Sequence, residues 1–153
     1  MAELSYRDRV RPEWIDYNGH LSEPYYVLVF GDATTHLMHT VGLGPALSGS
    51  SLYTVEAHIR YLREVGPDAE LEVTTRVLDA GGKKVRLCHE LRVAGDLVAT
   101  EEILAIHVAE SPARGTLSRR EGISRASPLP ADIAERLRGY LNPVPDYAGR
   151  AIA

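Results

Sequence analysis

Apolar residues recur at helical spacing in one early part of the chain, residues 23–41. Apolar positions three or four residues apart are typical of a helix that buries one face. Pro24 suits the first turn of such a helix, and Gly42 suits the residue just beyond its end. The pattern therefore predicts one long amphipathic helix. Its apolar stripe consists of Tyr26, Phe30, Ala33, Leu37 and Val41.

A period of two replaces this pattern after residue 51. Several stretches alternate apolar and polar residues and are rich in β-branched side chains, as expected for strands. A shorter strand is expected over residues 4–11, before Pro12, and glycine-containing turns at 80–83 and 94–96 predict antiparallel hairpins. The longer predicted strands are residues 52–63, 70–79, 84–94 and 97–109.

The alternation within residues 52–63 predicts which side chains share a face of the sheet. It places Tyr53, Val55, Ala57, Ile59 and Tyr61 on one face. It places Thr54, Glu56, His58 and Arg60 on the other. The second set favours a solvated or interfacial row of ion pairs.

A meander of long antiparallel strands with one early helix predicts the α+β class. We expect a curved sheet of about five strands wrapped around the helix. The polar, arginine-rich residues 111–127 are expected to be irregular, followed by a short helix over 130–141 and an extended arm over 142–153. We therefore predict a domain over residues 1–110 and a C-terminal extension, 111–153, that belongs to the same domain.

The composition excludes several classes of protein. The net charge of −4 argues against a general nucleic-acid binder, and no apolar run approaches the roughly 20 residues of a membrane span. The N-terminus lacks the apolar core of a signal peptide, so we expect a cytoplasmic protein. Cys88 is the only cysteine, which excludes an intrachain disulfide and a cysteine-based zinc cluster.

The most informative motif lies just before the predicted helix, where Asp16-Tyr17-Asn18-Gly19-His20 leads into Ser22 and Glu23. The Asp16 carboxylate could act as a base or a nucleophile. The unpaired N–H groups of the helix start, with the helix dipole, could hold an oxyanion. Acyl transfer needs both a base or nucleophile and a site that stabilises the oxyanion. The structural alternatives are that Asp16 caps the turn, that Gly19 only permits the turn and that His20 is a structural histidine.

The order of elements, with the Asp-x-x-Gly-His turn before the helix, resembles the hotdog-fold acyl-CoA thioesterases of the 4-hydroxybenzoyl-CoA type. The resemblance implies that Asp16 is the catalytic carboxylate and that N–H groups at the helix start polarise the thioester carbonyl. Many members have Asn-Asn where this chain has Ser22-Glu23, so the substrate of those members cannot be assigned directly to this chain. The resemblance covers residues 4–109, with matches at Asp16, Gly19, His20, Tyr26, Asp32, Ala33, Tyr61 and Leu62.

Residues 11–20, 29–33 and 53–60 are similar to one subfamily, the betainyl-CoA thioesterases of bacterial carnitine catabolism. This similarity implies hydrolysis of betainyl-CoA to glycine betaine and coenzyme A, with no cofactor beyond the coenzyme A of the substrate. It implies a homodimer or homotetramer, which exposed strand edges also favour. The alternatives are a thioesterase for another short-chain or aromatic acyl-CoA, a non-catalytic acyl-thioester binding domain and, more weakly, a hotdog hydratase.

A betainyl group ends in a trimethylammonium, which binds well over aromatic faces. The predicted aromatic cage is drawn from Trp14, Tyr17, Tyr25 and Tyr53, whose alternative role is in dimer contacts or at the edge of the core. Possible counter-charges to the cation are Glu23 and Glu56. The remaining predicted substrate-binding residues are Asn18 and Tyr26.

Three further sets of residues have the composition of ligand-binding groups. Asp32, His36 and His39 have the helical spacing of metal ligands, but the sequence offers no evident fourth ligand and the resembling family uses no metal, so no metal site is predicted. Two basic clusters could hold the phosphates of coenzyme A, although a charge run is usually a solvated face. They are Lys83 and Lys84 with Arg86, and Arg119 with Arg120.

Overall fold

The computed structural model describes residues 2–110 and 124–152. Within these residues the chain forms two α-helices, one short 3-10 helix and six strands. The helices are α1 (Glu23–Val41), α2 (Ala131–Arg138) and the 3-10 helix η1 (Pro12–Trp14). The strands are β1 (Leu4–Arg9), β2 (Ser50–Tyr61), β3 (Glu70–Gly81), β4 (Lys84–Val93), β5 (Asp96–Glu110) and β6 (Ser124–Ala126).

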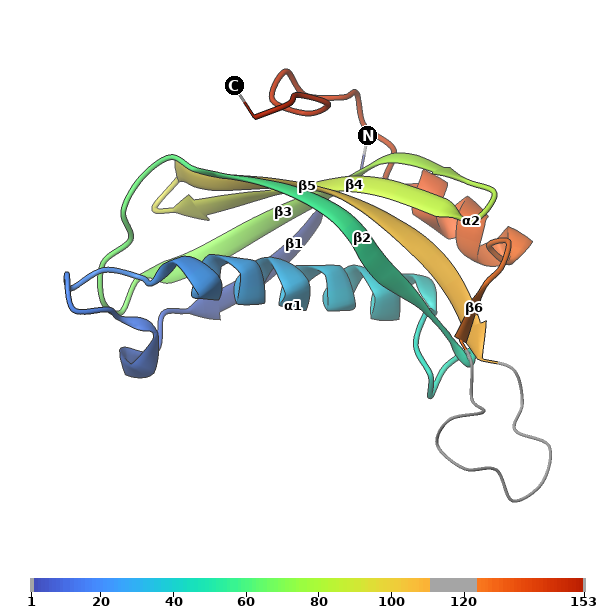
Figure 1. The fold of residues 1–153 in the computed structure, drawn as a ribbon, viewed down its shortest axis with the longest axis horizontal. Helices are drawn as coiled ribbons and strands as arrows, with labels where there is room; N and C mark the ends of the chain where they lie inside the picture. Colours follow the sequence, from blue (N-terminus) through green and yellow to red (C-terminus); the bar gives the residue numbers. More distant parts are fainter. Residues whose placement is uncertain (1, 111–123, 153) are drawn as a thin grey trace.

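The strands form one antiparallel sheet in the order β1-β3-β4-β5-β2, with β6 paired to β5. The sheet curves around α1, which lies along one face, while the C-terminal residues lie on the opposite face (Figure 1). We call these the helix-facing side and the outer side of the sheet. The predicted α+β fold is confirmed.

Helix α1 begins and ends where its sequence predicts. Gly42 has the left-handed φ of 92° that lets the chain leave the helix, and its N–H donates to Met38 O and His39 O. The predicted stripe faces the sheet, and Phe30 and Leu37 are fully buried. Burial of each such side chain contributes about 1.5–3 kcal/mol, which holds the start of α1, where the Asp16 turn joins it, in a fixed place over the sheet.

The register of β2 corrects the predicted faces of residues 52–63. A β-bulge between Thr54 and Glu56 shifts the pairing with β5 by one residue. A bulge adds a residue to one strand, so side chains on either side of it exchange faces. Tyr53 therefore lies on the outer side, as Glu56 does, whereas Tyr61 lies on the helix-facing side beside Ala99.

The C-terminal part differs from prediction in two details. Residues 111–123 of the expected irregular segment lie outside the described residues, but its end, Ser124–Ala126, forms β6. The short helix α2 covers Ala131–Arg138, a narrower range than 130–141, and passes into a turn in which the Gly139 N–H donates to Glu135 O and Arg136 O. Beyond α2 the chain crosses the outer side of the sheet, where Gly149 N–H donates to Glu102 Oε1 at 2.8 Å.

Candidate active site

The Asp16 turn precedes α1 and is closed by its own side chain. Asp16 Oδ1 accepts the N–H of Asn18 at 2.9 Å and that of His20 at 3.4 Å. The backbone completes the turn, since Gly19, at a φ of 79°, donates its N–H to Asp16 O. Asp16 therefore does cap the turn, as the structural alternative expects. Only Oδ1 is used, however, and Oδ2 accepts no hydrogen bond from the described residues, so the role as base or nucleophile stays available to it.

His20 faces away from Asp16 and toward the segment that follows β2. Its Nε2 lies 3.3 Å from Glu64 Oε2, an ion pair when the imidazole is protonated. Both side chains are substantially exposed, which limits the strength of such a pair. His20 is thus placed to orient the rim of the site and contacts Asp16 through its backbone N–H.

The first turn of α1 offers few free donors. Ser22 is the N-cap and its side chain makes no capping hydrogen bond, while Pro24 has no N–H. The N–H of Tyr25 donates to Ser22 O. Within the described residues, the N–H of Glu23 is left without an acceptor at the positive end of the helix dipole, where it can polarise a carbonyl oxygen.

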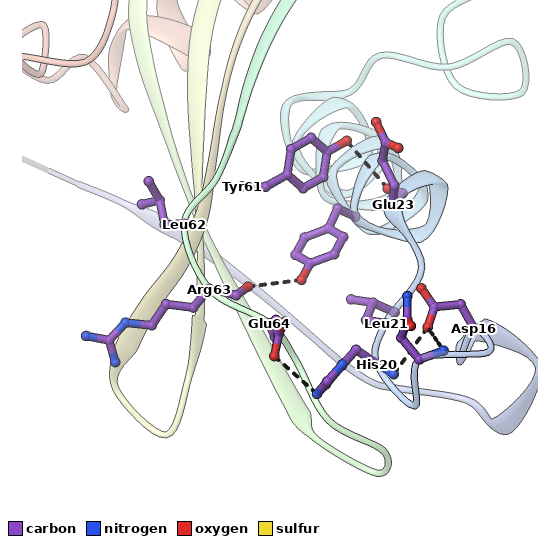
Figure 2. Close-up of a pocket in the computed structure, with 10 residues that line it drawn as sticks. Asp16, His20, Leu21, Glu23, Tyr61, Leu62, Arg63 and Glu64 are labelled. Atoms are coloured by element: carbon purple, nitrogen blue, oxygen red, sulfur yellow. Dashed lines mark hydrogen bonds and ion pairs between the residues drawn. The ribbon is translucent and has the colours of Figure 1, made fainter.

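A cleft of about 820 Å³ joins the Asp16 turn, the start of α1 and the end of β2. Its aromatic wall is formed by Tyr26 and Tyr61, whose rings meet edge to face with centroids 5.0 Å apart. The Tyr26 hydroxyl donates to Arg63 O at 3.1 Å, and that of Tyr61 reaches Glu23 O at 3.5 Å (Figure 2). The lining residues are Asp16, Asn18, His20, Leu21, Glu23, Tyr26, Tyr61, Leu62, Arg63 and Glu64.

The electrostatics of the cleft are dominated by carboxylates. Burial raises the pKa of the Tyr26 hydroxyl, and Tyr61, Glu64 and Asp16 raise it further. Burial also raises the pKa of Tyr61, with further contributions from Glu23 and Glu101. Both phenols are therefore neutral hydrogen-bond donors at neutral pH, in a cleft that favours a positively charged ligand.

The structure divides the predicted substrate-binding residues into two groups. Five of the predicted site residues line the cleft, namely Asp16, Asn18, His20, Glu23 and Tyr26. The predicted aromatic residues Trp14, Tyr17, Tyr25 and Tyr53 and the predicted counter-charge Glu56 are not among the lining residues of the cleft. The buried ring of Trp14 stacks on Tyr25 at 5.5 Å, and Tyr17 is 97% exposed. Tyr53 and Glu56 lie on the outer side of β2, away from the cleft, Tyr53 as a result of the bulge and Glu56 by its ordinary alternation with Tyr61.

The basic cluster at residues 83–86 lies on or beside the outer side of β4. Arg86 is already paired there, since its Nε donates to Glu102 Oε2 at 2.7 Å. Arg119 and Arg120 lie outside the described residues. Among the residues described, none of the His, Cys, Asp and Glu side chains form a group of three or more suited to a metal ion.

The sequence did not predict that the segment after β2, Arg63 and Glu64, lines the cleft, or that Glu101 is buried. Arg63 and Glu64 come shortly after Tyr61, the last residue of β2, so the signal present in the sequence was a pair of charged residues just beyond a strand end. Glu101 and Glu102 adjoin in an otherwise apolar strand, and the phase of β5 decides which is buried. Glu101 turns inward, with 6% of its side chain exposed.

The sheet wrapped around α1, with an acidic turn at the helix start, defines a hotdog fold of the acyl-thioester hydrolase type. The chain belongs to the Thioesterase-like superfamily, whose family profile matches residues 10–137. None of the helices in residues 2–110 and 124–152 is long and apolar enough to cross a membrane.

Particular relatives narrow the comparison. The betainyl-CoA thioesterase of Pseudomonas aeruginosa is 37% identical over 153 residues, covering 97% of this chain and 92% of that protein. An L-carnitine dehydrogenase/betainyl-CoA thioesterase of Agrobacterium fabrum is 40% identical over 143 residues, covering 91% of this chain and 28% of that longer protein. The crystal structure of a Pseudomonas putida KT2440 protein superposes with a TM-score of 0.80 at 33% identity, covering 100% of this chain and 97% of the other.

Proposed function

We propose that this protein hydrolyses acyl-CoA thioesters and that betainyl-CoA is its substrate, giving glycine betaine and coenzyme A. The observation that carries the proposal is that the free Oδ2 of Asp16 and the unpaired N–H of Glu23 belong to residues that line the same cleft, together with two tyrosines. The similarity to betainyl-CoA thioesterases along nearly the whole chain supports the choice of acyl group.

Asp16 takes the catalytic role in this proposal. As a general base, its Oδ2 accepts a proton from water while the oxygen of that water bonds to the thioester carbonyl carbon. The resulting oxyanion accepts the N–H of Glu23. Collapse of the intermediate breaks the C–S bond, and the coenzyme A thiolate takes up a proton. As a nucleophile, Asp16 would instead form an anhydride that water then hydrolyses.

The cleft favours an acyl group that carries a positive charge. Tyr61, which is 43% exposed, presents aromatic surface near the helix start and packs against the largely buried Tyr26. A quaternary ammonium over such a face gains about 0.5–2 kcal/mol, depending on desolvation. Glu23, Glu64 and Asp16 add negative potential around the same space. A neutral aromatic acyl group would gain from the rings but not from the carboxylates.

We further propose a homodimer formed through the edge of β2. Strands β1 and β2 are the two edges of the sheet in the order given above. Large apolar side chains are exposed along β2 and just beyond it, including Tyr53, Val55 and Leu62, and pairing would cover this edge. Because Tyr61 and Leu62 also line the cleft, a partner on this edge would border the site. A tetramer built from such dimers is the alternative.

A substrate panel tests the proposal against its alternatives. Steady-state hydrolysis of betainyl-CoA is compared with that of acetyl-, butyryl- and 4-hydroxybenzoyl-CoA. We expect the highest kcat/KM for betainyl-CoA. A preference for a neutral acyl group would support thioesterase activity but contradict betainyl-CoA as the substrate. Tight binding of all four thioesters without turnover would indicate the non-catalytic binding domain.

A further inference from the structure

A glutamate lies beneath α1 in the middle of the sheet, one layer behind the cleft. Glu101 of β5 faces the helix, opposite His89 of β4 and Ile59 of β2. Only 6% of its side chain is exposed. A carboxylate in such a position loses most of its stabilisation by water and needs a cation or hydrogen-bond donors in exchange.

The described residues supply neither a cation nor a hydrogen-bond donor to Glu101. His89 Nε2 lies 3.8 Å from Glu101 Oε1, which is too long for a hydrogen bond. That nitrogen is engaged elsewhere, 2.8 Å from Thr34 Oγ1, and His89 Nδ1 lies 2.8 Å from Thr75 Oγ1. Complete burial lowers the pKa of His89 to about 3, so its imidazole is neutral at neutral pH. Within the described residues, Glu101 therefore has neither a cationic partner nor a hydrogen bond.

The register of the sheet places Glu101 next to the wall of the cleft. Tyr61 is the next helix-facing residue of β2 after Ile59, which makes it a diagonal cross-strand neighbour of Glu101. The negative charge of Glu101 is one of the causes that raise the pKa of Tyr61. Tyr61 in turn forms the aromatic wall with Tyr26, so Glu101 lies directly behind that wall.

We propose that Glu101 is the counter-ion that selects a quaternary ammonium in the acyl group, with Tyr26 and Tyr61 between it and the catalytic carboxylate. This inference rests on the proposed function. A trimethylammonium has no N–H to donate, so it is recognised by charge and aromatic surface, and a carboxylate without hydrogen-bond donors around it suits such a cation. Glu23, the counter-charge expected from the sequence, is exposed at the cleft mouth, where water and salt screen its charge.

The test compares two substrates of the same shape, betainyl-CoA and 3,3-dimethylbutanoyl-CoA, in which carbon replaces the charged nitrogen. For Glu101→Gln we expect kcat/KM on betainyl-CoA to fall by about tenfold or more, as for loss of ~1.4 kcal/mol of transition-state binding. Hydrolysis of the neutral analogue should be unchanged or faster. Glu70→Gln, an exposed carboxylate at the start of β3, is the matched control and should leave both rates as they are.

The outcomes separate this inference from the proposed function. Wild-type protein that hydrolyses neither thioester would overturn the proposed function and, with it, this inference. An active wild type whose ratio of the two rates is unchanged in Glu101→Gln would overturn only the inference, as would an equal loss on both substrates. Glu23→Gln is measured in parallel, and a loss of charge selectivity in that variant alone would assign the role to Glu23 instead.

A stability measurement covers the case in which the variant folds poorly. If Glu101 is kept for ligand binding, the free protein carries an uncompensated carboxylate, and its removal should stabilise the fold. We expect the Tm of Glu101→Gln and Glu101→Met at pH 8 to exceed that of the wild type, with no change in Glu70→Gln. A lower Tm in both Glu101 variants would show that the carboxylate supports the fold and would overturn the inference.

Discussion

The hydroxyl of Thr34 on α1 lies 2.8 Å from Nε2 of His89 on β4, and the same hydroxyl donates to Phe30 O at 3.1 Å. Because a hydroxyl has one proton, it accepts a hydrogen bond from His89, which makes Nε2 the protonated nitrogen. His89 Nδ1 then accepts from the hydroxyl of Thr75. His89, in its neutral Nε2-protonated tautomer, thus links α1 to the centre of the sheet through hydrogen bonds to Thr34 and Thr75.

Thr34→Val tests this junction. The substitution keeps the shape of the side chain but leaves the buried Nε2–H of His89 without an acceptor. We therefore expect the free energy of unfolding to fall by about 1–3 kcal/mol. The measurement is the denaturant midpoint at unchanged m value. Thr40→Val is the matched control, since the Thr40 hydroxyl makes the same type of bond, to His36 O, on the exposed side of α1. An equal loss in both variants would contradict the role of His89.

Asp16→Asn tests the catalytic carboxylate. Asparagine retains an oxygen that can accept the N–H of Asn18, so the turn should survive and the Tm should change little. Loss of the base should lower kcat by about 10²-fold or more, and loss of a nucleophile by more still. Near-normal turnover by a folded Asp16→Asn protein would remove Asp16 from the mechanism.

Tyr61→Leu tests the aromatic wall of the cleft. Leucine keeps apolar bulk but removes the ring face, so kcat/KM on betainyl-CoA should fall about threefold to tenfold while that on 3,3-dimethylbutanoyl-CoA changes less. Tyr53→Leu examines the tyrosine that the sequence favours and that the bulge places on the outer side of β2. Charge selectivity that depends on Tyr53 and not on Tyr61 would move the cation site out of the cleft.

The pH dependence of stability tests the two buried titrating groups. Burial raises the pKa of Glu101 from 4.5 to about 7, so its folded form holds a proton that the unfolded chain has lost, and stability falls as pH rises between these values. Burial lowers the pKa of His89 from 6.5 to about 3, so stability rises with pH over that range. Each slope is about 1.4 kcal/mol per pH unit where only one state is protonated.

The two slopes have opposite signs and cancel between about pH 4.5 and 6.5. In Glu101→Gln only the histidine contribution remains, and we expect the free energy of unfolding to rise with pH across this window. Denaturant titrations of both proteins at closely spaced pH values measure the difference. Parallel curves for wild type and Glu101→Gln would contradict the raised pKa of Glu101.

Val55→Lys tests the proposed dimer edge. Val55 is exposed at the bulge of β2, and a lysine there would place like charges together across a symmetric interface. Light scattering at micromolar concentration should show a dimer for wild type and a smaller species for the variant. Val144→Lys, an exposed valine on the C-terminal segment, is the control. A wild-type monomer with full activity would contradict the dimer.

Local signals were sufficient to predict α1. Pro24 and Gly42 act on their own backbone, and the apolar stripe repeats every three to four residues, so neither depends on distant parts of the chain. The Asp16 turn is likewise local, since its hydrogen bonds span only a few residues. These features give the helix, the turn and the candidate carboxylate from sequence.

The other features of the site depend on pairing between distant parts of the chain, which the sequence alone does not predict. The alternation in residues 52–63 is uninterrupted in sequence, and only the pairing of β2 with β5 reveals the bulge that sends Tyr53 outward. The sequence likewise cannot distinguish Glu101 from Glu102 until the phase of β5 against α1 is known. The aromatic ring of Trp14 suits a cage for a trimethylammonium, but its packing on Tyr25 and its burial in the core depend on contacts that the sequence does not show.

The bulge between Thr54 and Glu56 has a consequence for how relatives are compared. A homologue with a strand of the same length but no bulge would have its Tyr53-like and Tyr61-like positions on the same face, although an alignment would pair every residue without a gap. A homologue that lacks only the bulged residue would keep them on opposite faces. Equivalences near the cleft are therefore safe when counted backward from Tyr61 and unsafe when counted forward from Ser50. Substrate preference could diverge within the family through gain or loss of this bulge at constant strand length, with every residue of the Asp16 turn left intact.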